Sequence, residues 1–371
     1  MTDDIRDRLA GIDDPRLDDD SEAQSASDHA SGQSPRADIV SLGLVGDIEI
    51  EDGVAHVPLA LGAPHAPAET EIATRVRDAV REAGYEPSLS IEIDDQTPAG
   101  LVEDAPNVIA VSSGKGGVGK STVAVNLAMA MAQRGASVGL FDADVYGPNI
   151  PRMLGVHGHP GMAEDDETII PLERHDLQLM SIGFLVGEDD PVIWRGPMVD
   201  KLLTQLYHDV AWDDLDYLVI DLPPGTGDAQ LTMLQQMPVV GSVVVTTPQD
   251  VALDNARKGV RMYDDHDAHV LGVVENMSTF VCPDCGGEHD VFDTGGGERL
   301  ADTYDLPLLG RIPLDPAIRE SGESGKPVVV DDTESAAIFE EIAERVMDRV
   351  GEIRRKSHRL TANKQEVPPV K

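Results

Sequence analysis

Short apolar runs separated by polar turns dominate the first part of the chain. Residues 45–50 and 54–59 alternate apolar and polar positions around a turn at residues 51–53, which predicts two neighbouring strands. Apolar residues then recur at helical spacing over residues 72–80, and residues 89–93 have the pattern of a third strand. The first part of the chain therefore predicts a small α/β domain.

Longer and more continuously apolar runs follow, and segments with helical spacing separate them. Runs of this kind are typical of strands in a parallel sheet that helices cover on both faces. The predicted strands are residues 108–111, 138–141, 217–222, 242–246, 270–274 and 308–312. The predicted fold class is therefore α/β, a doubly wound, mostly parallel sheet with helices on both faces, preceded by the small α/β domain.

These patterns divide the chain into four segments. The predicted boundaries are residues 1–95 for the small domain, 96–106 for a linker, 107–351 for the large domain and 352–371 for a loose, basic tail. A polar and acidic stretch at about residues 18–37 is expected to be a flexible insertion in the small domain.

The charge of the chain is strongly negative, with 68 acidic and 29 basic residues among 371 and a formal net charge of −39. Because the excess is spread over most of the chain, we interpret it as a surface adapted to high salt. At 1 M salt the Debye length falls to about 3 Å, so the repulsion between acidic side chains is screened. The same charge repels phosphate backbones, so no nucleic-acid partner is expected. No apolar run reaches the roughly 18 residues of a membrane span, and the acidic start differs from a signal peptide. We therefore expect a cytoplasmic protein without a membrane partner.

A glycine-rich segment follows the strand predicted at residues 108–111 and precedes a helical pattern. It reads Gly114-Lys115-Gly116-Gly117-Val118-Gly119-Lys120-Ser121-Thr122. Glycines let backbone N–H groups close around phosphate oxygens, and the helix N-terminus adds a favourable dipole. In such a loop Lys120 neutralises the β- and γ-phosphates and the Ser121 hydroxyl binds Mg²⁺. The segment therefore predicts a P-loop NTPase that binds ATP and Mg²⁺.

A second lysine near the start of this loop, Lys115, is more than a plain P-loop needs. The pattern resembles the deviant P-loop ATPases, the superfamily of septum-site, partitioning and nitrogenase-reductase ATPases. The resemblance implies that Lys115 reaches across a homodimer to the nucleotide of the partner.

Aspartates end two of the predicted strands, where ligands bind an open parallel sheet. The resemblance implies that Asp144 lies near the attacking water and that Asp221 is an outer-sphere Mg²⁺ ligand. Asp142 and Asp228 stand close to them in the sequence. Halophilic surface charge is the alternative interpretation of these aspartates.

Cys282 and Cys285 are the two cysteines of the chain, and their spacing suits a metal or redox centre better than a structural disulfide. A cubane cluster or a structural zinc takes about four ligands, and a symmetric dimer supplies the other two. Three alternatives stay open: a zinc site within one chain that also uses His289, a redox pair, and a pair without function.

Further motifs occur in a fixed order along the large domain. They are Asp144-Val145-Tyr146-Gly147-Pro148-Asn149, Trp194-Arg195-Gly196-Pro197-Met198, Asp221-Leu222-Pro223-Pro224-Gly225-Thr226-Gly227-Asp228 and Glu275-Asn276-Met277-Ser278. Together with the two lysines and the cysteine pair, they resemble the Mrp/ApbC family of iron–sulfur cluster carriers over about residues 106–350.

This resemblance implies slow ATP hydrolysis and an iron–sulfur cluster, with the 4Fe–4S form favoured, bridged across a homodimer by Cys282 and Cys285. It implies apoprotein recipients and assembly factors as partners. It also implies that Asn276 and the backbone at residues 311–313 hold the adenine.

Residues 38–45 resemble the SufT-like assembly domain that is often fused in front of these ATPases. The usual cysteine of that domain, which follows its second strand, is Ala66 in this sequence. We therefore expect this domain to dock partners rather than to bind metal.

The main alternative function is a positioning or partitioning ATPase that acts on a membrane or DNA surface. The basic segment at residues 354–359 lacks an apolar face, and such an ATPase has no use for Cys282 and Cys285. We therefore predict an ATP-hydrolysing cluster carrier, with a zinc-bridged P-loop ATPase as a further alternative.

Overall fold

The computed structural model describes most of the chain. The described residues are 2–17, 38–91, 107–163, 168–185, 196–225, 227–266, 268–282, 285, 287–292 and 294–365. They form two compact units, one made of Met1–Gln96 with Met347–Lys371 and the other of Thr97–Val346. The predicted insertion at residues 18–37 and the predicted linker at residues 96–106 lie outside the described residues.

The larger unit is built on a nine-stranded, mostly parallel sheet within the described residues. Its strands follow the order β13 (Glu288–His289), β12 (Val270–Val281), β11 (Val239–Thr246), β4 (Asn107–Ser113), β10 (Tyr217–Asp221), β5 (Val138–Asp142), β9 (Leu177–Ser181) and β8 (Leu172–Arg174), and β14 (Leu308–Leu314) also pairs with β12. β13 and β8 pair in the antiparallel direction. All strands predicted from apolar runs lie in β4, β5, β10, β11, β12 and β14, so the predicted fold class is confirmed.

The edge formed by β9 and β8 was not predicted from the sequence. Gln178 interrupts the apolar run of β9, and Ser181 ends it. Ser181 is nevertheless fully buried, because β9 pairs along β5 and its last residue lies beside Asp142. A small β-hairpin, β6 (Gly161–Met162) with β7 (Ile169–Ile170), also belongs to this unit.

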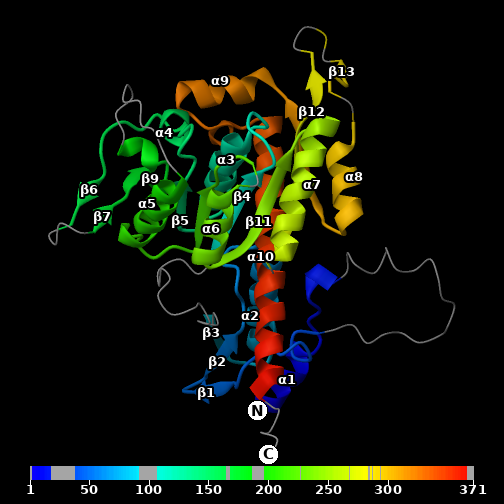
Figure 1. Cartoon of the computed structure of the whole chain (residues 1–371). Helices are drawn as coiled ribbons and strands as arrows, with labels where there is room; N and C mark the ends of the chain where they lie inside the picture. Colours follow the sequence, from blue (N-terminus) through cyan, green and yellow to red (C-terminus); the bar gives the residue numbers. More distant parts are fainter. Residues whose placement is uncertain are drawn as a thin grey trace, which may run out of the picture. The chain divides into compact units, whose positions relative to one another are not determined.

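Helices cover both faces of the sheet (Figure 1). α5 (Gly196–Asp209), α6 (Asp228–Gln236), α7 (Asp250–Asp265) and α8 (Gly296–Tyr304) lie on one face, and α3 (Lys120–Gln133) and the first part of α10 (Glu334–Gln365) lie on the other. A central strand covered on both sides must be apolar throughout, and all seven residues of β4 are buried. Two short helices, α4 (Ile150–Met153) and α9 (Pro316–Ser324), pack together near the carboxyl ends of the strands.

The smaller unit contains α1 (Thr2–Leu9) and a three-stranded sheet of β1 (Glu49–Glu51), β2 (Val54–Leu59) and β3 (Glu86–Ile91). β1 and β2 are antiparallel, and α2 (Pro67–Glu82) forms the crossover between the parallel strands β2 and β3. One apolar core joins the helices to the sheet, and Ile72, Val76 and Val80 of α2 are buried in it. Their spacing places them on one face of the helix, as the sequence predicts.

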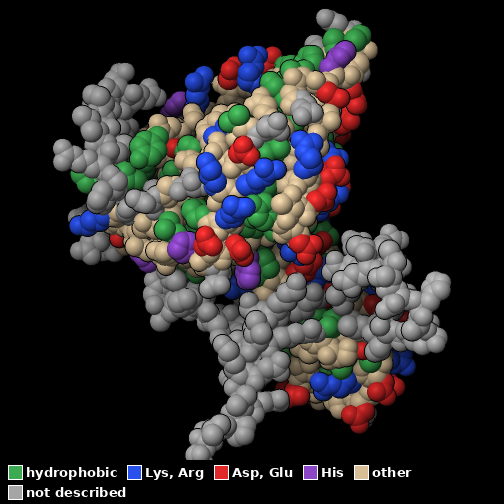
Figure 2. Space-filling model, turned by 45° about the vertical axis from the view of Figure 1, so that its right-hand side comes forward, with side chains coloured by type: hydrophobic (Ala, Val, Ile, Leu, Met, Phe, Trp, Pro, Cys, Tyr) green, Lys and Arg blue, Asp and Glu red, His purple; other side chains and the backbone are tan. Residues whose placement is uncertain are grey.

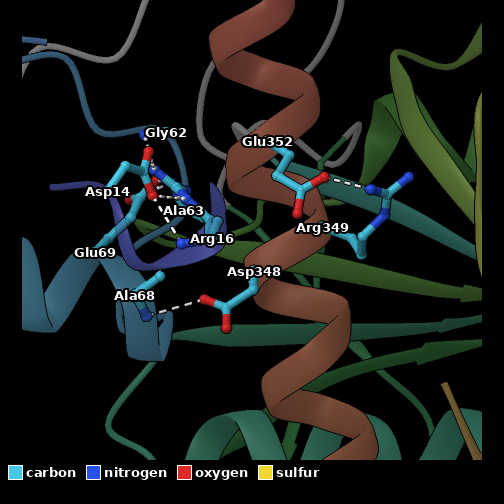
Figure 3. Close-up of polar contacts among 9 residues, drawn as sticks. All are labelled: Asp14, Arg16, Gly62, Ala63, Ala68, Glu69, Asp348, Arg349 and Glu352. Atoms are coloured by element: carbon cyan, nitrogen blue, oxygen red, sulfur yellow. Dashed lines mark hydrogen bonds and ion pairs between the residues drawn. The ribbon is translucent and has the colours of Figure 1, made fainter. Parts of the chain in front are cut away.

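A buried ionic cluster holds the smaller unit together (Figure 3). The Arg16 guanidinium pairs with Asp14 at 3.0 Å and with Glu69 at 3.2 Å, and the three side chains are at most 5% exposed. The Glu69 carboxylate also accepts the backbone N–H of Ala63 at 2.8 Å. Burial raises the pKa of Glu69, and the charge of Arg16 opposes this effect. The cluster ties residues on both sides of the predicted insertion to the first turn of α2.

We expect Arg16→Met to destabilise the smaller unit by about 3–5 kcal/mol, because it leaves two buried carboxylates without a cation. Hydrogen exchange of the α2 and β2 amides measures this loss within the full chain. Arg75→Met is the matched control, since Arg75 pairs with Glu71 at 2.5 Å on the exposed surface of α2, where an ion pair contributes about 0–1 kcal/mol. Equal exchange rates in the two variants would contradict the structural role of the cluster.

Helix α10 continues to Gln365, whereas a loose tail was predicted from residue 352. Its residues from Met347 onward belong to the smaller unit. There the Asp348 carboxylate accepts the N–H of Ala68 at 3.0 Å, in the first turn of α2, where Ala66 provides no side-chain cap (Figure 3). A Cβ on Gly62 would lie 2.6 Å from the Cβ of Arg354. At Asp348 and Arg354 the helix therefore packs within this unit, so the start of the predicted tail is a packed helix.

Charged side chains are unevenly distributed on the surface. On the face drawn in Figure 2, Asp and Glu side chains lie over both units, whereas Lys and Arg side chains gather near the middle of the larger unit. Among the described residues, no helix combines the length and the apolar character that a bilayer span requires.

Candidate functional site

The glycine-rich segment forms a loop between β4 and α3, as the sequence predicts. Gly119 caps α3 with a left-handed φ of 86°, and an added Cβ there would overlap the Asn276 amide. At the start of the loop, a Cβ on Gly114 would overlap the backbone of α7 at Asn255. Glycine is therefore required at both positions. The loop backbone lies against the backbone of α7 at Gly114 and against the Asn276 side chain at Gly119.

Lys120, the first residue of α3, is buried beneath this loop. Its Nζ lies 2.6 Å from Asp221 Oδ1 and 3.6 Å from Asp144 Oδ2. The structure thus brings together three of the predicted site residues, which come from α3, the end of β10 and the loop after β5. A phosphate that enters the loop competes with these carboxylates for the ammonium group.

The aspartates at the strand ends are not surface charges. Asp142 and Asp221 are fully buried, and Asp144 is 8% exposed. The Asp142 carboxylate accepts the N–H of Asp144 at 3.2 Å, the N–H of Ile150 at 3.3 Å and the hydroxyl of Ser181 at 2.9 Å. Burial, with a contribution from the charge of Asp221, raises the pKa of Asp142 to about 8. Asp142 therefore ties the segment around Asp144 to β9 and to α4. The side chain of Asp228 lies outside the described residues.

Asp221 has the surroundings of a magnesium ligand. Its Oδ1 pairs with Lys120, but its buried Oδ2 has no hydrogen-bond partner within the described part of the chain. Burial raises the pKa of Asp221, while the charge of Lys120 and the nearby hydroxyl of Ser121 oppose this effect. An acceptor oxygen of this kind, next to the P-loop serine, fits a hydrated Mg²⁺ ion.

Lys115 has a partner that sequence reasoning did not identify. Its Nζ donates to Gln249 Oε1 at 3.3 Å, and Gln249 is the residue that precedes α7. Lys115 is half-buried, whereas Gly116 and Gly117 are exposed. No local pattern marks Gln249, because its relation to Lys115 depends on the pairing of β11 with β4.

Asn276 lies in the middle of β12 and bonds to the P-loop itself. Its Nδ2 donates to Val118 O at 2.8 Å, and its Oδ1 accepts the N–H of Met277 at 2.9 Å. Met277 has a left-handed φ of 56°, and the register between β12 and β14 shifts in this part of the strand. The predicted role of Asn276 in holding adenine stays a prediction, and its observed contact is with the loop backbone.

The two cysteines lie in the turn of the hairpin that joins β12 to β13. Phe280 pairs with His289, and the N–H of Cys282 donates to Gly287 O at 2.9 Å, which closes the turn. Cys282 is half-buried and Cys285 is exposed. A Cβ on Gly287 would lie 3.3 Å from Cys285 Sγ and 3.4 Å from His289 Nε2. The described residues nevertheless contain no group of three or more His, Cys, Asp or Glu side chains arranged to hold a metal ion.

A cavity of about 360 Å³ lies beside the P-loop. Predicted site residues on its wall are Lys115, Gly116, Gly117, Gly119, Lys120, Ser121, Thr122 and Asp144. The opposite wall comes from α4 and α9 and was not predicted. Sequence reasoning contained no signal for this wall, because the two helices are far apart in the chain.

Comparison with protein families agrees with this site. Residues 104–347 match a family described as NUBPL iron-transfer P-loop NTPase, and residues 34–86 match one described as iron-sulfur cluster assembly protein. A protein named iron-sulfur cluster carrier protein from Synechocystis is 43% identical over 325 residues, which cover 83% of this chain and 92% of the relative. A protein of the same name from Escherichia coli K12 is 51% identical over 247 residues, which cover 66% of this chain and 67% of the relative.

Solved structures show the same fold. A nucleotide-binding protein from Archaeoglobus fulgidus, in complex with ADP, is 38% identical with a TM-score of 0.54, and the match covers 60% of this chain and 88% of that protein. The cell division ATPase MinD of Pyrococcus furiosus is 26% identical with a TM-score of 0.50, over 65% of this chain and 98% of that protein.

Proposed function

Because this chain belongs to the family of NUBPL iron-transfer P-loop NTPases, we propose that it hydrolyses ATP and carries an iron–sulfur cluster as its cargo. One observation supports the combination most directly. Strand β12 holds Asn276, which bonds to the P-loop, and Cys282 directly follows its last residue. The nucleotide site and the cysteine pair therefore share one strand.

The cluster is held between two copies of the chain. Cys282 and Cys285 supply two thiolates, and the described residues of one chain contain no group of three or more His, Cys, Asp or Glu side chains that could hold a metal. A cubane takes about four protein ligands, so a second copy related by a twofold axis completes the set. Cys285 is exposed, which leaves its sulfur accessible to a partner copy and to a recipient apoprotein.

The P-loop side performs the hydrolysis. Lys120 leaves Asp221 and Asp144 and neutralises the β- and γ-phosphates when ATP binds. Ser121 and Asp221 would hold a hydrated Mg²⁺ ion, which would supply further charge neutralisation. Asp144 then orients the attacking water, and Lys115 leaves Gln249 and contacts the nucleotide of the partner copy.

Nucleotide state reaches the cluster through β12. Closure of the P-loop around phosphate moves the carbonyl of Val118, to which Asn276 is bonded. Met277 has a left-handed φ where the register of β12 against β14 shifts, and a non-glycine residue keeps such a conformation only where its surroundings hold it. A shift at Asn276 therefore changes the position of the cysteine turn, and with it the affinity for the cluster.

The cluster passes to apoproteins in the cytoplasm. The smaller unit, which has Ala66 in place of a cysteine, docks partners or assembly factors.

Anaerobic reconstitution tests this proposal. Iron and sulfide should give a brown protein with broad absorbance at about 400 nm, because thiolate-bound cubanes absorb there. Iron analysis should give about four irons per two chains. Mass determination of the loaded protein should give a dimer. A colourless product that retains zinc after purification, or a loaded protein that stays monomeric, would contradict the proposal.

A further inference from the structure

The wall of the nucleotide cavity opposite the P-loop has a defined shape. Gly155 follows α4 and Gly325 follows α9, and both have left-handed φ values. A Cβ on Gly325 would lie 2.7 Å from Gly155 Cα, so the two helices meet through their backbones. A Cβ on Gly322 would lie 3.4 Å from the side-chain Cε of Met153, so the two helices also touch through this side chain. The side chains that line this wall of the cavity are therefore attached to a closely packed backbone.

The cavity carries more cations than carboxylates, although the chain as a whole has a net charge of −39. Its charged lining residues are Lys115, Lys120, Arg152 and Arg319 against Asp144 and Glu323. A local excess of positive charge in a strongly acidic chain favours an anionic ligand.

The four cations differ in how they are paired. Lys120 lies 2.6 Å from Asp221, Lys115 donates to Gln249, and Arg319 lies 3.6 Å from Glu320. The Arg152 side chain has no hydrogen bond or ion pair with any residue that the structure describes, whereas its backbone carbonyl accepts the N–H of Gly155 at 3.1 Å. Its guanidinium is thus available to a ligand in the cavity.

Arg152 is also connected to the catalytic side of the site. It lies on α4, whose first residue, Ile150, donates its N–H to Asp142 at 3.3 Å. The same carboxylate accepts the N–H of Asp144. A ligand that binds the Arg152 side chain therefore restricts the movement of α4. Because α4 and Asp144 share the Asp142 carboxylate, the same ligand also restricts the segment that carries Asp144.

We propose that Arg152 is a phosphate ligand of the bound nucleotide. It contacts the phosphates from the α4 wall, opposite the P-loop lysines, and so positions the segment around Asp144 when nucleotide is present. An arginine suits this role because its planar fork of N–H donors makes paired hydrogen bonds to phosphate oxygens. This inference rests on the proposed nucleotide binding and adds a residue that the P-loop pattern does not contain.

Titration calorimetry of Arg152→Gln with ATP, ADP and adenosine tests the inference. We expect the Kd for ATP and ADP to rise about 10- to 100-fold, because charge-assisted bonds to phosphate are lost. Adenosine should bind as it does to the wild type, and the salt dependence of ATP binding should decrease. Arg152→Lys should recover part of the affinity, and Arg75→Gln, which removes a cation from the exposed surface of α2 outside the cavity, should leave it unchanged.

Three results separate the possible errors. Wild-type affinity for ATP and ADP in Arg152→Gln would overturn this inference and leave the proposed function standing. An equal loss for adenosine would overturn it too, since the contact would then be with the nucleoside. A wild-type protein that binds no nucleotide would instead remove the proposed function. Unfolding temperatures without nucleotide show whether each variant is folded, and Arg152→Lys serves as the test if Arg152→Gln is not.

Discussion

We expect Cys282→Ala to reduce the iron content of reconstituted protein from about four atoms per two chains to background, while ATP binding, compared with the wild type in the absence of cluster, stays unchanged. The reason is the small number of ligands. Each chain supplies two thiolates, so the substitution removes half of the protein ligands from a cluster bridged across a dimer. The P-loop does not depend on the cysteine, because Asn276 rather than the hairpin turn bonds to Val118. Iron and sulfide analysis, visible absorbance and calorimetry with ATP measure the two properties separately.

His289→Ala is the matched control for this experiment. His289 lies in β13, near Cys285, and is the group that a zinc site within one chain would use. A cluster bridged by four cysteines is retained in His289→Ala. Loss of metal from His289→Ala together with loss from Cys282→Ala would instead support the mononuclear alternative. Joint loss of metal and ATP binding in Cys282→Ala would show that the cysteine turn supports the nucleotide site directly.

We expect Lys120→Ala to lower the affinity for ATP by about 10²- to 10³-fold, since it removes the buried cation that we propose contacts phosphate. It also destabilises the larger unit without nucleotide, because Asp221, Asp144 and Asp142 then lie close together with less positive charge. Loss of one partner from a buried ion pair costs about 3–5 kcal/mol. Calorimetry and thermal unfolding in the absence of nucleotide measure the two effects.

Lys115→Ala separates catalysis from folding. Lys115 contacts the neutral side chain of Gln249, so its removal leaves no buried charge unpaired. We expect thermal unfolding and ATP binding to stay near the wild-type values. Hydrolysis should fall by about 10²- to 10³-fold, because in the proposed mechanism Lys115 stabilises transition-state charge on the nucleotide of the partner copy. Normal hydrolysis in Lys115→Ala would contradict its action across a dimer, and normal hydrolysis in Lys120→Ala would contradict the P-loop assignment.

Several features of the fold could be predicted because their signals are local. The apolar runs of β4 and β10 predict buried strands, since helices on both faces exclude water from every residue. Spacing could not identify β9, because Gln178 and Ser181 break its apolar run and its burial depends on pairing with β5. The tail is a similar case, since α10 runs on to Gln365 and the close approach of its Arg354 to Gly62 brings together residues far apart in the chain.

The sequence by itself determined the P-loop, its two lysines, the aspartates that follow strands and the cysteine pair. Each depends on backbone conformations or spacings that adjacent residues impose, as at Gly119. The tertiary structure alone decided which groups surround them: Gln249 beside Lys115, Asp142 between Asp144 and α4, and the α4 and α9 wall that carries Arg152. These neighbours come from distant segments, and the strand order that brings them together leaves no periodic pattern in the sequence.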